Sequence, residues 1–201
     1  MKKIFELINS YKLVLIKILF YEISYILLGY KGNKFIIRND INSTDTIPCS
    51  YFFLSIIYKK IKNENITSLV DLGCGNGRAL YYFNKKLKID YSGVELFKNS
   101  YDNCIKIFQN FSNIKIINKN FFDLNFIKTN FDCYFLNDPL KRLDSHNNLI
   151  NSIISSHKLI RKRAIFILVN LSEGKYDVFK PLDLVFSYHV NTKNIRIYKL
   201  K

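Results

Sequence analysis

The sequence predicts an α/β fold: a three-layer sandwich around a mostly parallel seven-stranded sheet, with an antiparallel C-terminal hairpin and a helical N-terminal extension. Two observations support this prediction. From residue 68 onward, short apolar stretches alternate with helical patterns, as in a parallel sheet that is covered on both faces. The last two apolar stretches are separated only by the turn-prone residues 191–194, which permits an antiparallel pair at the sheet edge.

The strands are short and apolar, and each is followed by polar or turn-forming residues. They are expected at Ser68–Leu72, Tyr91–Glu95, Ile114–Asn118, Cys133–Leu136, Ala164–Val169, Leu184–His189 and Ile195–Leu200. Helices are expected at about residues 50–62, 77–86, 98–110 and 145–159. Pro48 lies just before the first of these helices, where proline favours a helix start.

Length and composition predict one main domain. The chain has 201 residues, of which 48% are hydrophobic and 15% aromatic, so it can bury a core and global disorder is excluded. We expect residues 1–48 to form an N-terminal helix and arm and residues 49–201 to form the domain. Neither the cysteines nor the histidines have the spacing of a zinc site, so no metal is expected. Reduced cysteines without such spacing are typical of a cytoplasmic protein.

The chain is strongly basic, with 31 Lys and Arg against 16 Asp and Glu and a net charge of +15. Such a charge favours an anionic partner, which could be a nucleic acid, an acidic membrane surface or an acidic protein. The alternative is that AT-rich coding DNA has enriched the protein in lysine. Because the lysines are scattered and form no nucleic-acid-binding motif, a nucleic acid is not the expected partner.

Residues 13–30 are the most apolar segment of the chain. Lys17 and Glu22 interrupt it, and a charge near the centre of a bilayer costs roughly 2.5–3.5 kcal/mol, so we do not expect it to span a membrane. A helix packed on the domain is the first expectation. The second is peripheral membrane contact through residues 1–30, with four lysines near lipid phosphates: Lys2, Lys3, Lys12 and Lys17.

The residues VDLGCGNGR at 70–78 follow an apolar strand and open a helix. Glycines at 73, 75 and 77 allow the backbone to turn sharply and to approach a ligand closely. A dinucleotide-binding loop would need a glycine at position 78, which is Arg78, and no phosphate-binding Gly-Lys-Ser/Thr sequence is present. What remains is the pattern E/D-x-G-x-G-x-G, with Asp71 two residues before the first glycine, in a nucleotide-type ligand loop at the strand end where α/β sheets bind ligands.

This stretch resembles the first motif of class I S-adenosylmethionine-dependent methyltransferases, which have a Rossmann-like seven-stranded sheet. The resemblance covers about residues 68–140 and implies S-adenosyl-L-methionine as the cofactor. It implies that Glu95, at the end of the second strand, binds the ribose, because a carboxylate can accept hydrogen bonds from the ribose hydroxyls. It also implies the remaining cofactor-binding residues: Asp71, Gly73, Cys74, Gly75, Asn76, Asn120 and Phe121. Of these, Asn120 would lie near the adenine amino group and Phe121 on the adenine face.

The loop that begins with Asn137 and Asp138 follows the fourth strand, and the resemblance places it beside the reactive methyl group. Asn137 could orient an acceptor amine, and Asp138 could take a proton from the acceptor or hydrogen-bond to it. Both residues could equally be structural. The sequence NDPL only partly resembles the loop of adenine- and glutamine-modifying enzymes. It lacks the second proline and the aromatic residue on which a flipped base would stack, so DNA methylation is disfavoured.

The sequence TIPCSY at 46–51 resembles an arm that precedes the glycine loop in some small bacterial methyltransferases. It is also similar to the arm of certain membrane-associated protein lysine methyltransferases. The resemblance implies that Thr46, Ser50 and Tyr51 cover the cofactor and border the acceptor pocket. The alternative is that Pro48 only starts a helix and Tyr51 packs in the core.

The sequence therefore predicts an enzyme that transfers a methyl group to an oxygen or nitrogen nucleophile. The acceptor would belong to a small molecule, a glycan precursor or a protein. One alternative is a membrane-associated protein lysine methyltransferase. The other is a non-catalytic RNA-binding protein that has kept the methyltransferase fold.

Overall fold

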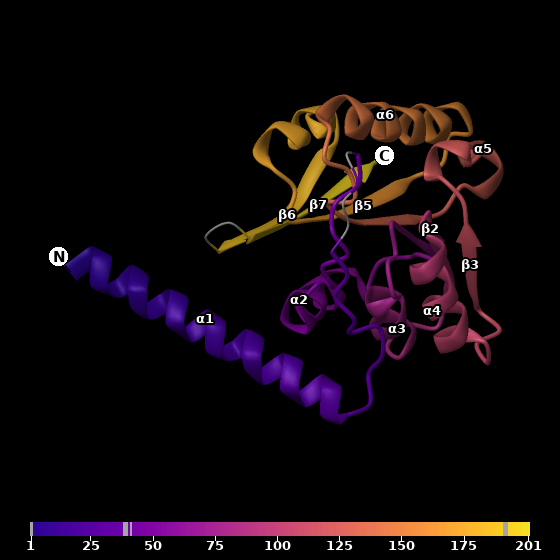
Figure 1. Ribbon diagram of the computed structural model, residues 1–201. Helices are drawn as coiled ribbons and strands as arrows, with labels where there is room; N and C mark the ends of the chain where they lie inside the picture. Colours follow the sequence, from indigo (N-terminus) through magenta and orange to yellow (C-terminus); the bar gives the residue numbers. More distant parts are fainter. Residues whose placement is uncertain (1, 38–39, 41, 191–192) are drawn as a thin grey trace.

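A seven-stranded sheet lies at the centre of the molecule (Figure 1), in the strand order β3-β2-β1-β4-β5-β7-β6. The computed structural model describes residues 2–37, 40, 42–190 and 193–201. The strands are β1 (Ser68–Leu72), β2 (Asp90–Glu95), β3 (Ile114–Asn118), β4 (Cys133–Asn137), β5 (Ala164–Val169), β6 (Asp183–Val190) and β7 (Lys193–Leu200). The first five strands are parallel to one another, and β7 is antiparallel to both β5 and β6. The predicted fold class is confirmed.

The C-terminal hairpin differs in detail from the prediction. The hairpin lies at the sheet edge, as predicted, with β7 between β5 and β6 and with β6 outermost. Lys193 and Asn194, predicted to be part of the turn, already belong to β7. Asn191 and Thr192 lie outside the described residues.

Helices cover both faces of the sheet (Figure 1). One face carries α2 (Tyr51–Ile61), α3 (Arg78–Asn84) and α4 (Lys98–Phe108). The other carries α5 (Phe126–Thr129), α6 (Leu143–Leu159) and the 3-10 segment η2 (Glu173–Phe179). Because side chains alternate along a strand, each strand contributes to two cores. In β1, Leu69 packs in the core beneath α2 and α3, whereas Val70 and Leu72 pack in the core beneath α6.

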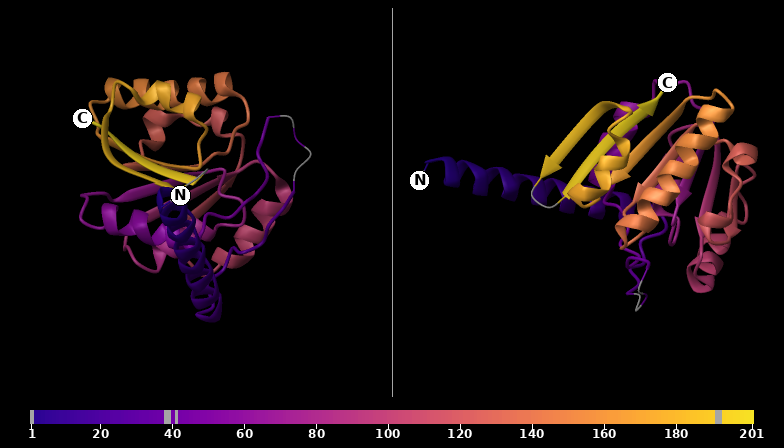
Figure 2. Two further views of the ribbon diagram at one scale, coloured as in Figure 1. Left: turned by 90° about the vertical axis from the view of Figure 1, so that its left-hand side faces the viewer. Right: turned by 90° about the horizontal axis from the view of Figure 1, so that it is seen from above.

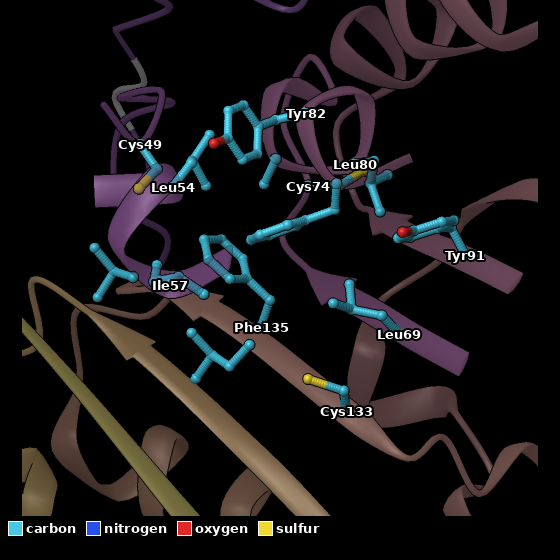
Figure 3. Close-up of a cluster of buried hydrophobic side chains, with 14 of the residues drawn as sticks. Cys49, Leu54, Ile57, Leu69, Cys74, Leu80, Tyr82, Tyr91, Cys133 and Phe135 are labelled. Carbon is cyan, nitrogen blue, oxygen red and sulfur yellow. The ribbon is translucent and has the colours of Figure 1, made fainter. Parts of the chain in front are cut away.

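The core beneath α2 and α3 supports the strand ends (Figure 3). Phe135 of β4 and Leu69 of β1 lie on the sheet side of this cluster. Leu54 and Ile57 of α2 cover it from the helix side. All four side chains are at most 1% exposed. This packing fixes α2 against the face of the sheet formed by β1 and β4.

The C-terminal part of helix α1 (Lys2–Leu27) contacts the domain. Tyr25 stacks on Tyr51 with 4.9 Å between ring centroids, and Glu22 forms an ion pair of 2.7 Å with Arg78. The rest of the helix extends away from the sheet (Figures 1 and 2). The predicted packing on the domain therefore holds for one side of the C-terminal part only. Among the described residues, no helix has the combined length and apolar character needed to cross a bilayer.

Candidate functional site

A cavity of about 350 Å³ lies at the carboxyl ends of β1, β2, β3 and β4. The glycine loop, these strand ends and the arm before α2 line it. All the residues that the sequence predicted to bind the cofactor line this one cavity: Asp71, Gly73, Cys74, Gly75, Asn76, Glu95, Asn120 and Phe121. Residues from three strand ends thus meet in one space, as parallel topology requires.

The glycine loop is tied to the neighbouring strand. The backbone N–H groups of Gly73 and Cys74 donate to the Val94 carbonyl at 2.9 and 3.1 Å. Gly75 has φ +55°, and a Cβ there would lie 2.5 Å from Cγ2 of Thr46. Only glycine fits this position, because the left-handed backbone and the close approach of the arm both exclude a side chain.

Glu95 fixes the centre of the loop from the adjoining strand. Its Oε2 accepts the N–H of Gly75 at 2.8 Å, and its Oε1 accepts the N–H of Phe97 at 2.8 Å. The side chain is 1% exposed. A carboxylate oxygen can accept more than one hydrogen bond, so a group that holds the loop can also bind a ligand's hydroxyls.

Asp71 is a buried carboxyl group that lines the cavity and is 4% exposed. Among the described residues it has no hydrogen-bond or ion-pair partner. Burial, followed by the nearby charge of Glu95, raises the pKa of Asp71 to about 8. The group therefore holds its proton at neutral pH unless a cation enters the cavity.

Apolar side chains form one end of the cavity beyond Glu95. Asn120 accepts the N–H of Phe122 through its side chain and so caps the short 3-10 segment η1 (Phe121–Asp123). Phe121 packs against the core under α6, while Phe122 is more exposed and also lines the cavity. Leu96, directly after Glu95, completes this apolar wall, which suits a flat ring such as a purine.

The arm before α2 closes the other side of the cavity. Ile36 and Thr46 exchange backbone hydrogen bonds at 3.2 and 2.9 Å, and the side chain of Asn76 donates to the Lys34 carbonyl. Thr46 lies over Gly75 and lines the cavity. Its hydroxyl oxygen is buried and has no hydrogen-bond partner among the described residues. A buried hydroxyl without a partner is costly, so a ligand that bonds to it would be favoured.

The two predicted catalytic residues are engaged elsewhere. Asn137 lines the cavity, but its amide donates to the Ile47 carbonyl at 2.8 Å and accepts from Asn170 at 3.1 Å, so it anchors the arm. Asp138 does not line the cavity, contrary to the prediction. Its backbone has φ 43°, and its carboxylate pairs with Lys175, whose side chain is 5% exposed. Burial raises the pKa of Asp138, and the Lys175 ammonium opposes that effect.

Two of the three predicted substrate-binding residues are structural. Ser50 caps α2 by accepting the N–H of Phe53 at 3.2 Å. Tyr51 is fully buried, and its hydroxyl donates to the side chain of Asn33 at 2.6 Å. Neither residue lines the cavity. For Tyr51, the alternative that it packs in the core is correct.

Sequence reasoning missed several cavity residues. Leu96 and Phe97 follow a predicted strand end, and the strand-end rule could have found them. Arg142 and Ser145 come from the start of α6 and carry no local signal of a site. Asp40 and residues 42–45 were predicted only as part of the arm, because their position at the cavity depends on contacts such as the bridge between Ser43 and Leu140.

Comparisons with known proteins agree with this geometry. Residues 69–158 match the family model described as a methyltransferase domain. The resemblance based on the glycine loop is confirmed, and the chain has the class I S-adenosylmethionine-dependent methyltransferase fold. A search of curated proteins found no match. The boundary between residues 48 and 49 lies outside the matched range and stays a prediction.

Solved structures with this fold are only distantly similar in sequence. An RNA methyltransferase from Salinibacter ruber, in complex with S-adenosyl-L-homocysteine, is 9% identical with a TM-score of 0.60, over 76% of this chain and 93% of that chain. Magnesium protoporphyrin IX methyltransferase from Synechocystis PCC 6803, with bound S-adenosylmethionine, is 12% identical with a TM-score of 0.54, over 72% and 75%. The cyclase SpnF is 11% identical with a TM-score of 0.57, over 70% and 59%. Proteins with different activities thus share the fold, so the function of this chain must be argued from its site.

Proposed function

We propose that the chain is an enzyme that binds S-adenosylmethionine in the cavity and transfers its methyl group to an acceptor. The acceptor atom would be an oxygen or nitrogen nucleophile on a small molecule, a glycan precursor or a protein. The proposal rests mainly on the pair of buried carboxyl groups, Asp71 and Glu95, beside the glycine loop.

This pair selects among adenosine-containing ligands by charge. The Glu95 carboxylate repels the phosphates of a nucleotide, and the protonated Asp71 is expected to ionise only beside a cation. Arg78 also lines the cavity, but its guanidinium is already paired with Glu22 at 2.7 Å. S-adenosylmethionine carries a ribose for Glu95, no phosphate, and two cationic groups that can stabilise an ionised Asp71. The residues present therefore fit this cofactor.

The residues of the chain would act mainly by positioning. When bound, S-adenosylmethionine would supply an electrophilic methyl group on a sulfonium, whose sulfur is a good leaving group because it departs as a neutral thioether. Glu95 would hold the ribose, and the apolar wall at Leu96 and Phe122 would hold the adenine ring. The arm at Thr46 would cover the cavity and exclude water, which favours direct displacement by a correctly oriented acceptor. Because Asp138 is paired with Lys175, the proposal assigns it no proton transfer.

Cofactor binding should release a proton from Asp71. At pH 7 this carboxyl group is protonated in the free protein, since its pKa is raised to about 8, and a cation beside it favours the ionised form. Calorimetric titration with S-adenosylmethionine in two buffers of different ionisation enthalpy should show release that approaches one proton at pH 7. Asp71→Asn should abolish that release. Equal proton release by both proteins would contradict this assignment.

Thr46 should bond to the ligand through its hydroxyl. Thr46→Val keeps the shape and removes the buried oxygen that lacks a partner. We expect the free energy of unfolding to stay equal or rise slightly, because no internal hydrogen bond is lost. The dissociation constant of the cofactor, or the KM of the acceptor, should rise about fivefold to tenfold, the value of one hydrogen bond. A variant that is less stable but binds equally well would contradict a ligand-binding role.

The proposed activity can be tested with the purified chain. Calorimetry with S-adenosylmethionine should show binding at a single site. Incubation of the chain with native cell extract and isotope-labelled S-adenosylmethionine should then yield a labelled product by mass spectrometry, and Glu95→Ala should yield none. Absence of cofactor binding, together with salt-dependent binding of RNA, would favour the non-catalytic alternative.

A further inference from the structure

The outward side of α1 is an apolar surface that no part of the described chain covers. Six large apolar side chains, each 52–81% exposed, share this side: Leu13, Ile16, Leu19, Phe20, Ile23 and Leu27. At 100° per residue they fall within an arc of about 120°. We define these six residues as the outward face of α1.

The opposite side of the same helix is held by the domain. Tyr21 contacts Phe52 edge-on, Tyr25 stacks on Tyr51, and Glu22 is paired with Arg78. The outward face therefore cannot turn inward without breaking an ion pair and aromatic contacts. It faces solvent because of how the helix is attached.

The position of Glu22 changes the electrostatics of the helix. In the sequence Glu22 interrupts the apolar segment, but in the structure its carboxylate accepts from Arg78 and from the N–H of Tyr51 at 2.8 Å. Among the side chains described from residue 12 to residue 27, it is the only acidic one. The charges that remain exposed on this part of α1 are those of Lys12 and Lys17.

We propose that the outward face of α1 docks on an anionic lipid bilayer surface, with the helix lying in the plane of the interface. The apolar side chains would enter the boundary between headgroups and acyl chains, and Lys12 and Lys17 would contact lipid phosphates. The stretch from Leu13 to Leu27 is only about 21 Å long at 1.5 Å per residue, which suits a helix that lies on a bilayer and does not cross it.

Two observations favour a lipid surface over a second copy of the chain. The chain carries a net charge of +15, so two copies repel each other while an anionic surface attracts each one. The apolar side is also too wide for a two-helix seam, because Leu15 and Ile26 extend it where a coiled coil carries charged flanking residues. The views in Figures 1 and 2 show the N-terminal part of α1 clear of the sheet, so the domain leaves a flat surface room to approach.

The test uses the full chain and sedimentation with two kinds of vesicle, one of phosphatidylcholine alone and one that also contains phosphatidylserine. We expect the chain to pellet with the anionic vesicles at least tenfold more strongly than with the neutral ones. Replacement of Ile16, Phe20 and Ile23 by Glu should reduce binding to the anionic vesicles at least tenfold. Lys12→Ala and Lys17→Ala should each reduce it about fivefold without affecting neutral vesicles.

A matched control separates the effect of the outward face on vesicle binding from the effect of the total charge. Replacement of Ile105, Ile127 and Leu159 by Glu makes the same change of charge at exposed apolar positions on α4, α5 and the end of α6. This variant should bind the anionic vesicles within about twofold to threefold of the unmodified chain. Equal loss of binding in both triple variants would overturn the proposal, because charge alone would then explain the binding.

Two further outcomes would also overturn it. One is equal binding of the unmodified chain to both vesicle types. The other is a dimer in analytical ultracentrifugation without lipid, which the α1 variant converts to a monomer while neither protein binds vesicles. The last result would assign the outward face to a second copy. Far-UV circular dichroism and thermal unfolding would verify that each variant is folded. If the triple variant of α1 is not folded, the two single lysine variants test the proposal.

Discussion

Glu95→Ala should weaken binding of S-adenosylmethionine at least tenfold and abolish methyl transfer. The variant would lose two charge-assisted hydrogen bonds to the ribose, each worth about 1.5–3 kcal/mol. A loss of about 1.4 kcal/mol already raises the dissociation constant tenfold. The variant also loses the bonds that Glu95 accepts from the N–H groups of Gly75 and Phe97. The glycine loop would then no longer be fixed against β2. Calorimetry gives the dissociation constant directly.

Two further variants make this result specific. Asp123→Ala removes an exposed carboxylate from the nearby 3-10 segment η1 and so makes the same change of charge. We expect its dissociation constant to stay within about twofold of the unmodified chain, as for an ordinary surface substitution. Glu95→Gln keeps the shape of the side chain and serves if the alanine variant does not fold. A dissociation constant that is unchanged in folded Glu95→Ala and Glu95→Gln would show that the cofactor binds elsewhere.

Asp138→Asn should strongly lower the free energy of unfolding. It should lower the kcat of methyl transfer only slightly. The substitution keeps a residue that tolerates the observed φ of 43°, but it leaves the Lys175 ammonium, 5% exposed, without its counter-ion. Removal of one partner from a fully buried pair costs about 3–5 kcal/mol, and Asp138 is 26% exposed, so we expect a loss of about 2–3 kcal/mol. Denaturant unfolding measures this change.

The double variant Asp138→Asn with Lys175→Met separates structure from catalysis. Because the buried charge is then removed as well, stability should recover most of the loss. Its kcat should lie within about threefold of the unmodified chain if Asp138 is structural. A general base would contribute about 10²–10⁴-fold. A double variant that is stable and folded but has lost that much kcat would restore the catalytic role that the sequence predicted for Asp138.

The sequence was sufficient where function follows from local pattern and strand topology. The glycine loop directly follows an apolar strand, and Glu95 ends the next one, so the rule that parallel strands place their carboxyl ends at one edge brought them together. The observed hydrogen bond of 2.8 Å between Gly75 and Glu95 agrees with that reasoning. Asn120 and Phe121 were assigned through the family resemblance, and both line the cavity.

The sequence was insufficient where the orientation of a side chain depends on a partner that is far away along the chain. Asp138 follows a strand end like Glu95, but a left-handed backbone turns it toward Lys175, 37 positions later in the chain. Glu22 was read as a charge that interrupts an apolar helix, while the structure buries much of it against Arg78 and Tyr51. Such pairings depend on tertiary contacts that neither periodicity nor spacing contains.

The most direct measurement is a crystal structure of the chain grown with S-adenosyl-L-homocysteine. We expect both ribose hydroxyls within hydrogen-bond distance of the Glu95 carboxylate and the adenosyl group against the bend at Gly73–Gly77. A ligand bound in another part of the molecule, with the Glu95 carboxylate in contact only with protein, would contradict the proposed site and the enzyme activity that rests on it.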